Sequence, residues 1–587
     1  MRTSPAWILL GALSVVFHLA LIFSGLVPNL VSRPLHLALA LPWVFLFAEQ
    51  GRVQKILSAV LCITGICICL WIAFNQSALG DQYGFLVNDQ QLFMAIVLLA
   101  IVVEMARRAI GWPLPMVAVI ALAYGIYGHH LSGEFGFAPL PVQSFLGTLT
   151  IAEGGIWGSL AGISVGIVAV FVIFGAVLNA GEAGQGFMNL AAAAGGRLRG
   201  GAAKMALISS ALFGSISGSA SANVASTGAV TLPAMTRLGY PRSLAGATEA
   251  VASSGGQIMP PLMGAGAFVM VELTGVPYTG IMSAALLPAL LYFFAVWMGL
   301  DAYSRRYDLK PLDASMLPAG KLVLISTAFF LMPFCTLLYG MFIGGYTPQY
   351  AACQAIIAAV LLLFFDPSLK PKGRRFVQRV SEACVNAGQQ IATIAAIIFC
   401  ASIIVGVLGI TGAGVKVTSL ILSGSGGLLW PALGLTALAC LVLGMEVPTT
   451  AAYVICVSVA GPALIDLGLA PLQAHLFIFW FALLSTITPP VCGAVFIAAG
   501  MVQENWLRVA ANAMVLGLGL YLIPLAMIST PQLLELSKTP ILALAATLKM
   551  MLALSLISFG IIRQGTQWLR LVMVCGGLLL VFLPLEV

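Results

Sequence analysis

The sequence has very little charge. Only 8% of its 587 residues are charged, whereas 61% are hydrophobic and the mean hydropathy is +1.07. About a quarter of the residues in an ordinary soluble domain are charged, so this composition excludes that class and predicts a chain that lives in a bilayer. The formal net charge of +7 is then expected to report on membrane topology, not on nucleic-acid binding.

Motifs for metal binding, nucleotide binding and catalysis are also scarce. The 11 Cys include no CxxC pair, which argues against a disulfide framework and against a zinc site. The dipeptide Gly320-Lys321 is followed by Leu322, so it is not a P-loop and the chain has no nucleotide site of a primary pump. No HExxH motif occurs, and isolated Ser residues do not make a catalytic constellation. We therefore expect a protein that is not an enzyme and that holds no resident cofactor.

Long apolar runs are what the sequence has in abundance. A helix crosses the hydrocarbon core with about 20 apolar residues, and Lys and Arg collect in cytoplasmic loops. Spans near 6–26, 34–49, 56–74 and 91–106 leave most of the basic residues of their loops on one side, which is predicted to be the cytoplasm. The first run is expected to be a permanent span, since further spans follow at once.

One uncharged segment does not fit a simple crossing. Residues 205–236 contain a Ser- and Gly-rich centre, Gly214–Asn223, and basic residues such as Lys204 and Arg237 flank both ends. A single crossing would place one basic cluster outside. A helical hairpin that enters from the cytoplasm and leaves on the same side satisfies the charges.

The segment has a second copy at a constant offset of 229 residues. Pro233 corresponds to Pro462, and Pro260-Pro261 corresponds to Pro489-Pro490. Five crossings separate the copies, so we predict an inverted repeat whose second hairpin, at 417–465, opens to the other side. Two such mouths around one midplane site are what alternating access requires.

Each hairpin is followed by a long span, 243–275 or 472–502, that is interrupted at paired prolines. Proline removes an amide donor, so both helices are expected to unwind there and to expose carbonyls and helix N-termini to a cation or an anion. For four symmetry-matched polar patches we favour a binding site over close helix packing of the small-xxx-small type. The predicted substrate- or ion-binding residues are Ser217, Gly218, Ser219, Ser221, Asn223, Ser253, Ser254, Gly255, Gly256, Gln257, Pro260, Gly444, Pro448, Thr449, Thr450, Ser485, Thr486, Thr488 and Pro489. The hairpin tips and helix breaks are also candidate sodium sites.

Three ionisable residues fall at membrane depth. A carboxylate at a helix centre costs about 2.5–3.5 kcal/mol on insertion scales, so it is expected to line a cavity or to titrate. Glu446, at the second hairpin tip, is the leading candidate for proton coupling. Glu249 has two open roles, proton coupling or a hydrogen-bonded structural one. His475 is predicted to be interfacial, and Glu272 is expected near the outer surface.

The expected fold is an all-α polytopic membrane protein with about 15 transmembrane helices and two re-entrant helical hairpins. Its predicted regions are 1–108 with four helices, 109–180 with a linking helix, 181–410 and 411–530 with the two repeats, and 531–587 with C-terminal helices.

The motifs resemble the membrane component of tripartite ATP-independent periplasmic (TRAP) transporters, of the TAXI type with fused small and large membrane subunits. The resemblance is carried by Gly214–Val224, Glu249–Pro261, Pro448–Tyr453 and Thr488–Val491. It implies a small-subunit-like region at 1–108 and an elevator mechanism in a fold like that of the ion transporter superfamily. It also implies H⁺- or Na⁺-driven uptake of a small organic carboxylate, delivered by a periplasmic substrate-binding protein at the bacterial inner membrane.

The sequence departs from this family at two positions. Pro448 stands where other branches have Asp, and Glu446 stands where TAXI-type relatives have a small residue. The sodium ligands of other branches are therefore not assigned to these positions, and the two departures favour proton coupling over sodium coupling. A channel, or a carboxylate/ion symporter that needs no binding protein, remains an alternative.

Overall fold

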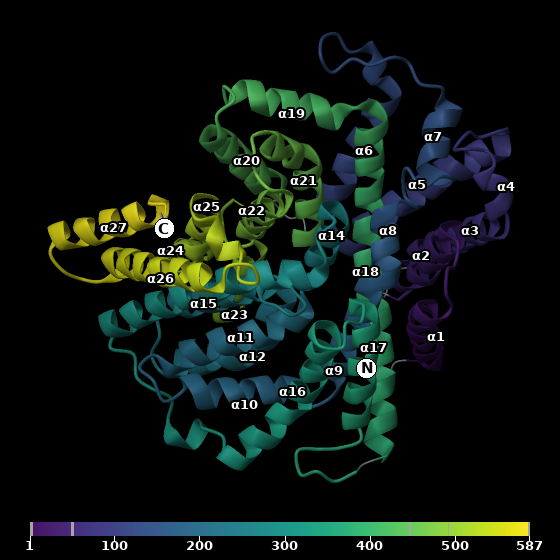
Figure 1. The fold of residues 1–587 in the computed structure, drawn as a ribbon. Helices are drawn as coiled ribbons and strands as arrows, with labels where there is room; N and C mark the ends of the chain where they lie inside the picture. The colour runs from purple at the N-terminus through teal and green to yellow at the C-terminus, as the bar shows by residue number, and fades with distance from the viewer. Residues whose placement is uncertain (1–3, 48–51, 372, 445–447, 491, 585–587) are drawn as a thin grey trace.

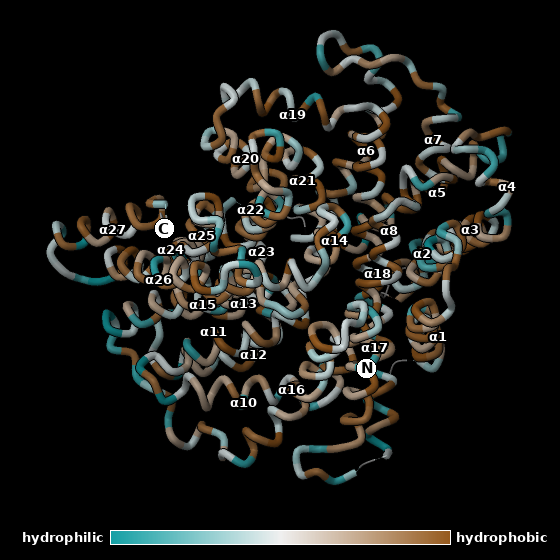
Figure 2. Tube along the Cα trace, viewed as in Figure 1, coloured by the Kyte–Doolittle hydropathy of each residue, from teal (hydrophilic) through white to brown (hydrophobic). Residues whose placement is uncertain are grey.

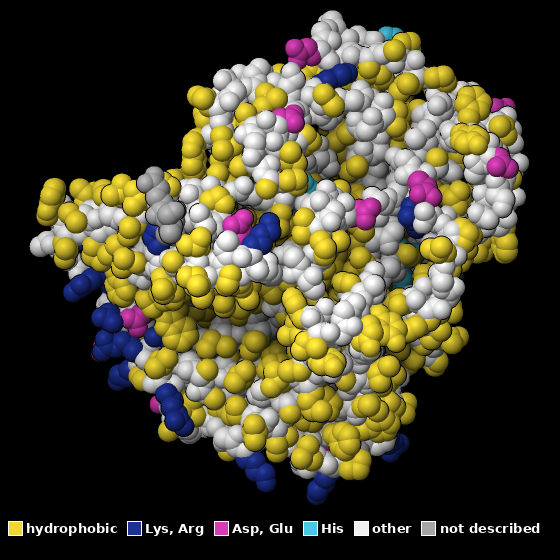
Figure 3. Space-filling view, viewed as in Figure 1, with side chains coloured by type: hydrophobic (Ala, Val, Ile, Leu, Met, Phe, Trp, Pro, Cys, Tyr) yellow, Lys and Arg dark blue, Asp and Glu magenta, His cyan; other side chains and the backbone are white. Residues whose placement is uncertain are grey.

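The computed structural model describes residues 4–47, 52–371, 373–444, 448–490 and 492–584, which fold into helices joined by short connections (Figure 1). Nine of the described helical segments are long and apolar enough to cross a membrane, and further apolar helices of 10–17 residues accompany them. The tube is predominantly hydrophobic along these helices (Figure 2). Lys and Arg side chains gather along the lower and lower-left edge of the space-filling view, as expected for a cytoplasmic face (Figure 3).

The N-terminal region packs against one long helix. Its helices are α1 (Pro5–Phe23), α2 (Asn29–Phe45), α3 (Arg52–Phe74), α4 (Gln76–Gly80) and α5 (Asp89–Ile110). Helices α1, α2 and α5 all contact α18 (Gly373–Thr411), which runs through the middle of the molecule. The four predicted spans of this region are therefore helices, and α18 is one of the elements that join them to the rest of the protein.

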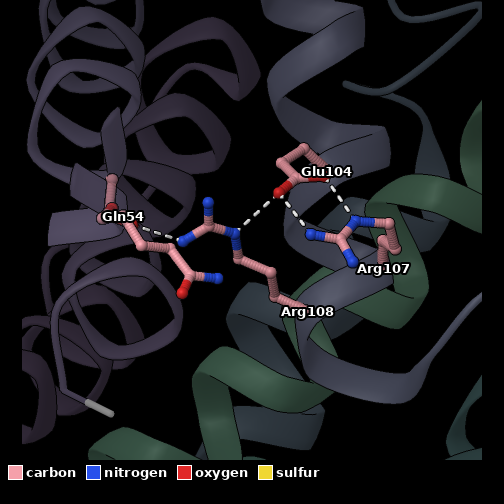
Figure 4. Close-up of polar contacts among 5 residues, drawn as sticks. Gln54, Glu104, Arg107 and Arg108 are labelled. Atoms are coloured by element: carbon pink, nitrogen blue, oxygen red, sulfur yellow. Dashed lines mark hydrogen bonds and ion pairs between the residues drawn. The ribbon is translucent and has the colours of Figure 1, made fainter. Parts of the chain in front are cut away.

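A cluster of charged side chains lies at the C-terminal end of α5 (Figure 4). Glu104 accepts hydrogen bonds from Arg107 Nε at 2.7 Å and from Arg108 Nε at 2.7 Å. Arg108 also donates to Ser58 Oγ on α3 at 2.5 Å and stacks over the Phe45 ring of α2. The cluster thus fastens α2, α3 and α5 together where α5 ends.

The next segment leads to the first repeat. It contains α6 (Pro113–Tyr127), η1 (Gly128–His130), α7 (Val142–Thr150), α8 (Ser159–Ile163), the π-helical turn η2 (Ser164–Val168) and α9 (Ala169–Ala180). The last three form one continuous helical run from Ser159 to Ala180.

The first repeat begins with a helix that was not predicted, α10 (Ala183–Gly195). It continues with α11 (Gly201–Ser217), α12 (Ala220–Arg237), α13 (Arg242–Gly255), η3 (Gly256–Ile258) and α14 (Gly264–Thr274). Helices α11 and α12 pack against each other as the predicted hairpin. The Ser219 side chain caps α12 by accepting from the Ala222 amide, and Gly218 turns the chain with a φ of 60°.

Four helices connect the repeats: α15 (Tyr278–Arg306), α16 (Gly320–Phe342), α17 (Pro348–Leu362) and α18, with the turn η4 (Ala314–Met316) between the first two. The second repeat comprises α19 (Ala413–Gly424), α20 (Leu429–Leu443), α21 (Thr449–Asp466), α22 (Pro471–Leu484), α23 (Gly493–Val502), α24 (Trp506–Leu516) and α25 (Gly519–Ser529). The C-terminal part comprises η5 (Pro531–Leu534), α26 (Pro540–Ile562) and α27 (Gln567–Phe582).

The second hairpin is shorter than predicted. Its two packed arms are α20 and α21, so it covers 429–466 and not 417–465. Residues 413–424 form the separate helix α19, which ends in a turn with positive φ at Gly426 and Gly427. Two successive residues in that conformation stop a helix, and this is why the two segments are distinct.

Candidate functional site

The two repeats share their element boundaries. Shifting α12 by 229 residues gives α21, and shifting α13 by the same number gives α22. Helix α14 begins at Gly264 and α23 at Gly493, which is again the same offset. A repeat inferred from a few proline pairs therefore matches the described helices of both copies.

The repeats are also interlocked. Each hairpin packs against the first half of its own broken helix, α13 or α22. In addition, α12 of the first repeat contacts α23 of the second, and α21 of the second contacts α14 of the first. This reciprocal exchange brings both helix breaks and both hairpin tips to one place.

A cavity of about 840 Å³ opens at this place. On one side of the cavity lie the hairpin tips and helix breaks of the two repeats. On the other side lie α9 and α18, which are called the scaffold helices below. The predicted residues that line it are Ser217, Gly218, Ser219, Ser221, Gln257, Gly444, Pro448, Thr449, Thr450, Ser485 and Thr486. Among the described lining residues none carries a charge, so a ligand here would meet hydroxyls, carboxamides and backbone groups.

The first hairpin tip approaches the first break through glycines. A Cβ atom on Gly214 would lie 2.5 Å from the Gly256 Cα atom, and one on Gly218 would lie 2.8 Å from the Gly264 Cα atom. Such distances exclude any side chain at these positions without a shift of backbone. Gly256, and with it Gly255, therefore serves close packing behind the cavity and does not line it.

The two breaks touch directly. Ser254 Oγ of the first break lies 2.8 Å from Thr486 Oγ1 of the second. Ser254 also reaches the Ala250 carbonyl at 2.8 Å, within its own helix. Thr488, next to Pro489, lies off the cavity and bonds to Tyr521 Oη of α25 at 2.9 Å. Pro260 and Pro489 likewise do not line the cavity; they belong to the breaks that shape it.

Asn223 holds the hairpin together and does not line the cavity. It is fully buried, and its Nδ2 group donates to the Ser210 carbonyl at 2.9 Å and to the Ser253 carbonyl at 3.4 Å. These contacts join α12 to α11 and to α13. The residue predicted as a ligand thus fixes the position of the tip that carries other candidate ligands.

Glu249 lies in a buried cage of hydroxyl groups. Its carboxylate accepts from Thr227 and Thr231 of α12, and from Ser210 of α11 and Ser253 of α13, each of the last two at 3.3 Å. Within the described part of the chain, no ion pair reaches it. The carboxylate therefore ties both hairpin arms to the broken helix.

This cage exists in one repeat only. At the 229-residue offset, the five cage positions are occupied by residues without a hydroxyl or a carboxylate: Ala439, Cys456, Ala460, Ile478 and Ala482. All five polar groups are replaced together, as expected for a unit in which a carboxylate without its donors would be costly. The two repeats thus differ at the position that Glu249 occupies in the first.

The remaining ionisable candidates have different outcomes. His475, predicted to be interfacial, is buried near the start of α22, and its Nδ1 atom lies 2.8 Å from Tyr453 Oη. The Tyr453 hydroxyl on the neighbouring hairpin arm explains the burial, because it gives the ring a polar partner. Glu272 is exposed at the end of α14. Glu446 lies outside the residues that the structure describes.

Four polar residues on the scaffold side of the cavity were missed: Asn179 on α9, and Gln389, Gln390 and Thr393 on α18. A signal was available, because Asn386, Gln389 and Gln390 place three carboxamides near the start of the apolar run at 384–410. The site was predicted only from features that recur at the repeat offset. The scaffold wall does not obey that symmetry.

One segment of the sequence has the Gly-x-Ser-x-Gly spacing that is typical of a catalytic serine in hydrolases. Residues 162–166 read Gly-Ile-Ser-Val-Gly, but the Ser164 side chain is buried in the π-helical turn η2 and lies 2.9 Å from His36 Nε2. His36 in turn lies 2.8 Å from His18 Nε2, so this chain of hydrogen bonds joins α1 and α2 to η2. Ser164 does not line the cavity.

A set of broken helices and paired hairpins around a polar, uncharged cavity is the architecture of a multi-pass membrane permease. The comparisons with known proteins define which one. The family of the tripartite ATP-independent periplasmic transporter, DctM component, matches residues 97–542, and the chain belongs to this family of TRAP transporter large permeases. Its members are transport proteins and not enzymes.

The sequence identities to individual relatives are low. The chain is 25% identical over 201 residues to the C4-dicarboxylate TRAP transporter large permease protein DctM of Pseudomonas aeruginosa, covering 34% of this chain and 46% of that protein. It is 23% identical over 402 residues to the isethionate TRAP transporter permease protein DctMQ of Oleidesulfovibrio alaskensis, covering 67% and 61%. An uncharacterized protein, y4mL, of Sinorhizobium fredii is 30% identical over 225 residues, covering 37% and 52%. The chain thus spans about half the length of most of these relatives.

Proposed function

We propose that the protein is the permease of a secondary transporter that imports a small organic carboxylate across the bacterial inner membrane, driven by an H⁺ or Na⁺ gradient. The observation that carries this proposal is the cavity between the two repeats on one side and α9 and α18 on the other. A site on the boundary between two bodies becomes accessible to either side of the membrane when one body moves past the other. This is the elevator mechanism that the proposal includes.

The neutral polar groups of the cavity suit an anion that another protein has already selected from solution. Hydroxyls and carboxamides such as those of Ser217, Gln257 and Gln390 can donate to a carboxylate without holding it as tightly as a guanidinium would. Ser217 Oγ is buried and has no protein partner within the described part of the chain. We therefore propose that selection belongs to a periplasmic substrate-binding protein, as in other TRAP systems, and that the permease supplies passage.

Coupling is assigned to the hairpin regions. Glu249 is the described candidate for a proton site, and Glu446 is the second candidate on sequence grounds. Sodium would use carbonyls and hydroxyls at the tips and breaks, because no group of three His, Cys, Asp or Glu that could hold a metal ion occurs among the described residues. Residues 1–108 are proposed to play the part of the small membrane subunit, and the TAXI type is proposed from the sequence motifs.

The test is uptake of radiolabelled carboxylates into proteoliposomes that hold the purified chain, with the cognate binding protein added outside. Separate Na⁺ and H⁺ gradients are imposed. We expect accumulation above the outside concentration with one of the two gradients and only with the binding protein present. Equilibration without accumulation would indicate a channel, and accumulation without the binding protein would indicate a binding-protein-independent symporter; either result would overturn the proposal.

A further inference from the structure

Helix α18 is much longer than a membrane requires. Its 39 residues extend over about 58 Å, whereas the hydrocarbon core is about 30 Å thick. The basic sequence 370–375 runs into its N-terminal end, which lies toward the lower edge of the molecule, where Lys and Arg side chains gather (Figures 1 and 3). The helix therefore connects the cytoplasmic face to the level of the cavity.

Polar residues follow one face of this helix. At 100° per residue they fall within a stripe about 100° wide. Above Arg375 and Arg379, which lie on the same face, the stripe comprises Glu382, Asn386, Gln389, Gln390 and Thr393. It ends at the cavity, where the last three of these residues are lining residues. Beyond Thr393 the same face continues with Ile397, Cys400, Ile404 and Val407, so the stripe leads from the cavity in the cytoplasmic direction only.

On this part of α18 polar side chains are exposed and apolar ones are buried, which is the opposite of the pattern expected for a helix that faces lipid. Asn386 and Gln390 are exposed, whereas their neighbours Val385, Ile391 and Ala392 at the same depth are buried. A helix that turned this face to lipid would present apolar side chains and would bury its carboxamides. Exposed carboxamides therefore indicate contact with water.

The neighbouring charges frame the lower part of the stripe. Glu382 accepts a hydrogen bond from Gln378 at 2.9 Å. Arg379 pairs with Glu182, three residues after the cavity-lining Asn179, and also donates to the Phe365 carbonyl at 2.8 Å. This ion pair holds the start of α10 beside α18 and thus borders the same route.

We propose that the α18 face formed by Asn386, Gln389, Gln390 and Thr393 is the fixed wall of a hydrated path through which the transported anion passes between the cavity and the cytoplasm. Carboxamides supply hydrogen-bond donors to a carboxylate without a fixed positive charge, so the anion is not trapped on its way out. The inference rests on the proposed function for the identity of the ligand. The existence of the water path is measurable without any substrate.

The experiment uses the full chain carrying Cys384→Ala, which removes a native thiol from the same segment. Asn386→Cys and Gln390→Cys are the test variants; Val385→Cys and Ile391→Cys are matched controls at the same depth. Inside-out and right-side-out vesicles are treated with a membrane-impermeant cationic thiol reagent, and the modified residue is identified by mass spectrometry. Size-exclusion chromatography confirms that each variant is folded.

We expect the two test cysteines to react in inside-out vesicles at least about tenfold faster than the two controls, because only an exposed thiol in water is reactive. Absence of labelling in both vesicle orientations, or labelling by a lipid-soluble maleimide alone, would overturn the inference. Labelling together with failed carboxylate uptake would leave the path in place and would count against the proposed function only. A second variant, Gln390→Leu, is expected to slow uptake severalfold while labelling at Asn386→Cys persists; unchanged uptake would contradict the role of the wall in passage.

Discussion

Ser254 Oγ and Thr486 Oγ1 lie 2.8 Å apart, although 232 residues separate them in the chain. Ser254 belongs to the break in the first repeat and Thr486 to the break in the second. Their contact joins the two interrupted helices beside the cavity. Each hydroxyl oxygen also lies 2.8 Å from a carbonyl oxygen of its own repeat, that of Ala250 or of Leu483, so one hydroxyl donates across the pair while the other donates to its own repeat. The pair is therefore a direct link between the two halves of the candidate site.

This link predicts energetic coupling. Ser254→Ala and Thr486→Val remove the same hydrogen bond, so their combined effect on the free energy of unfolding should fall short of the sum by about 0.5–1.5 kcal/mol. Denaturation of the purified protein in detergent measures the double-mutant cycle. Ser555→Ala is the control partner, because the Ser555 hydroxyl bonds to the Met551 carbonyl of its own helix. Additivity in the first cycle would show that the bond is absent.

The first hairpin tip should not tolerate a side chain. Gly218→Ala places a Cβ atom 2.8 Å from Gly264 Cα and also imposes a positive φ on Ala. The matched control is Gly239→Ala, which has a φ of 80° and open space around it. Both variants should lose about 1–2 kcal/mol from the backbone conformation. Gly218→Ala should lose about 1–3 kcal/mol more from the clash, together with most uptake activity. Equal unfolding free energies for the two variants would contradict the close approach.

Removal of the caged carboxylate should loosen the first hairpin. Glu249→Ala leaves the hydroxyls of Thr227, Thr231, Ser210 and Ser253 without their shared acceptor, and we expect a loss of about 1–3 kcal/mol in the free energy of unfolding. The exposed Glu272 provides the control, and Glu272→Ala should change the free energy by less than about 0.5 kcal/mol.

The isosteric variant Glu249→Gln separates structure from coupling. It keeps the side-chain volume and one acceptor oxygen but cannot bind and release a proton in the same way. If Glu249 carries the coupled proton, as proposed, uptake by this variant should no longer depend on the proton gradient while the protein remains folded. A variant that is folded and retains normal proton-driven uptake would assign Glu249 to structure alone.

Gln257 and Asn223 should differ in what they impair. Gln257 lines the cavity, so Gln257→Ala should reduce uptake at least about tenfold with little change in thermal stability. Asn223 donates hydrogen bonds to two buried carbonyls. Asn223→Ala should therefore lower the free energy of unfolding by about 1–3 kcal/mol and should also reduce uptake. Uptake assays and thermal unfolding of the same preparations make the comparison. Normal uptake in both variants would count against this location of the site.

Much of the fold was readable from local patterns. Proline pairs at a constant offset predicted both helix breaks, and the Ser- and Gly-rich tip with basic flanks predicted the first hairpin. These features are local because prolines and glycines act on the backbone that contains them. The second hairpin was predicted too long, since the turn at Gly426 and Gly427 was not recognised as the end of α19.

The scaffold wall was not predicted, for a different reason. Gln389 and Gln390 lie in a helix whose sequence gives no indication of which neighbour it faces, and α10 was missed because its Ala- and Gly-rich sequence carries no long apolar run. Asn223 and Gln257 look alike as polar residues near a break. Only the packing shows that one supports the backbone and the other faces the cavity.

By itself, the sequence determined that this protein is a multi-pass membrane protein, where its helices break, and that its two halves are related by a repeat. Hydrophobic length, proline and charge placement act within a few turns of the chain, so these properties need no knowledge of distant contacts. The tertiary structure alone decided which half meets which: the exchange of α14 and α23 between repeats, the contact of Ser254 with Thr486 and the α18 wall. Each of these depends on side chains hundreds of residues apart being packed against one another, and helical periodicity does not encode a partner.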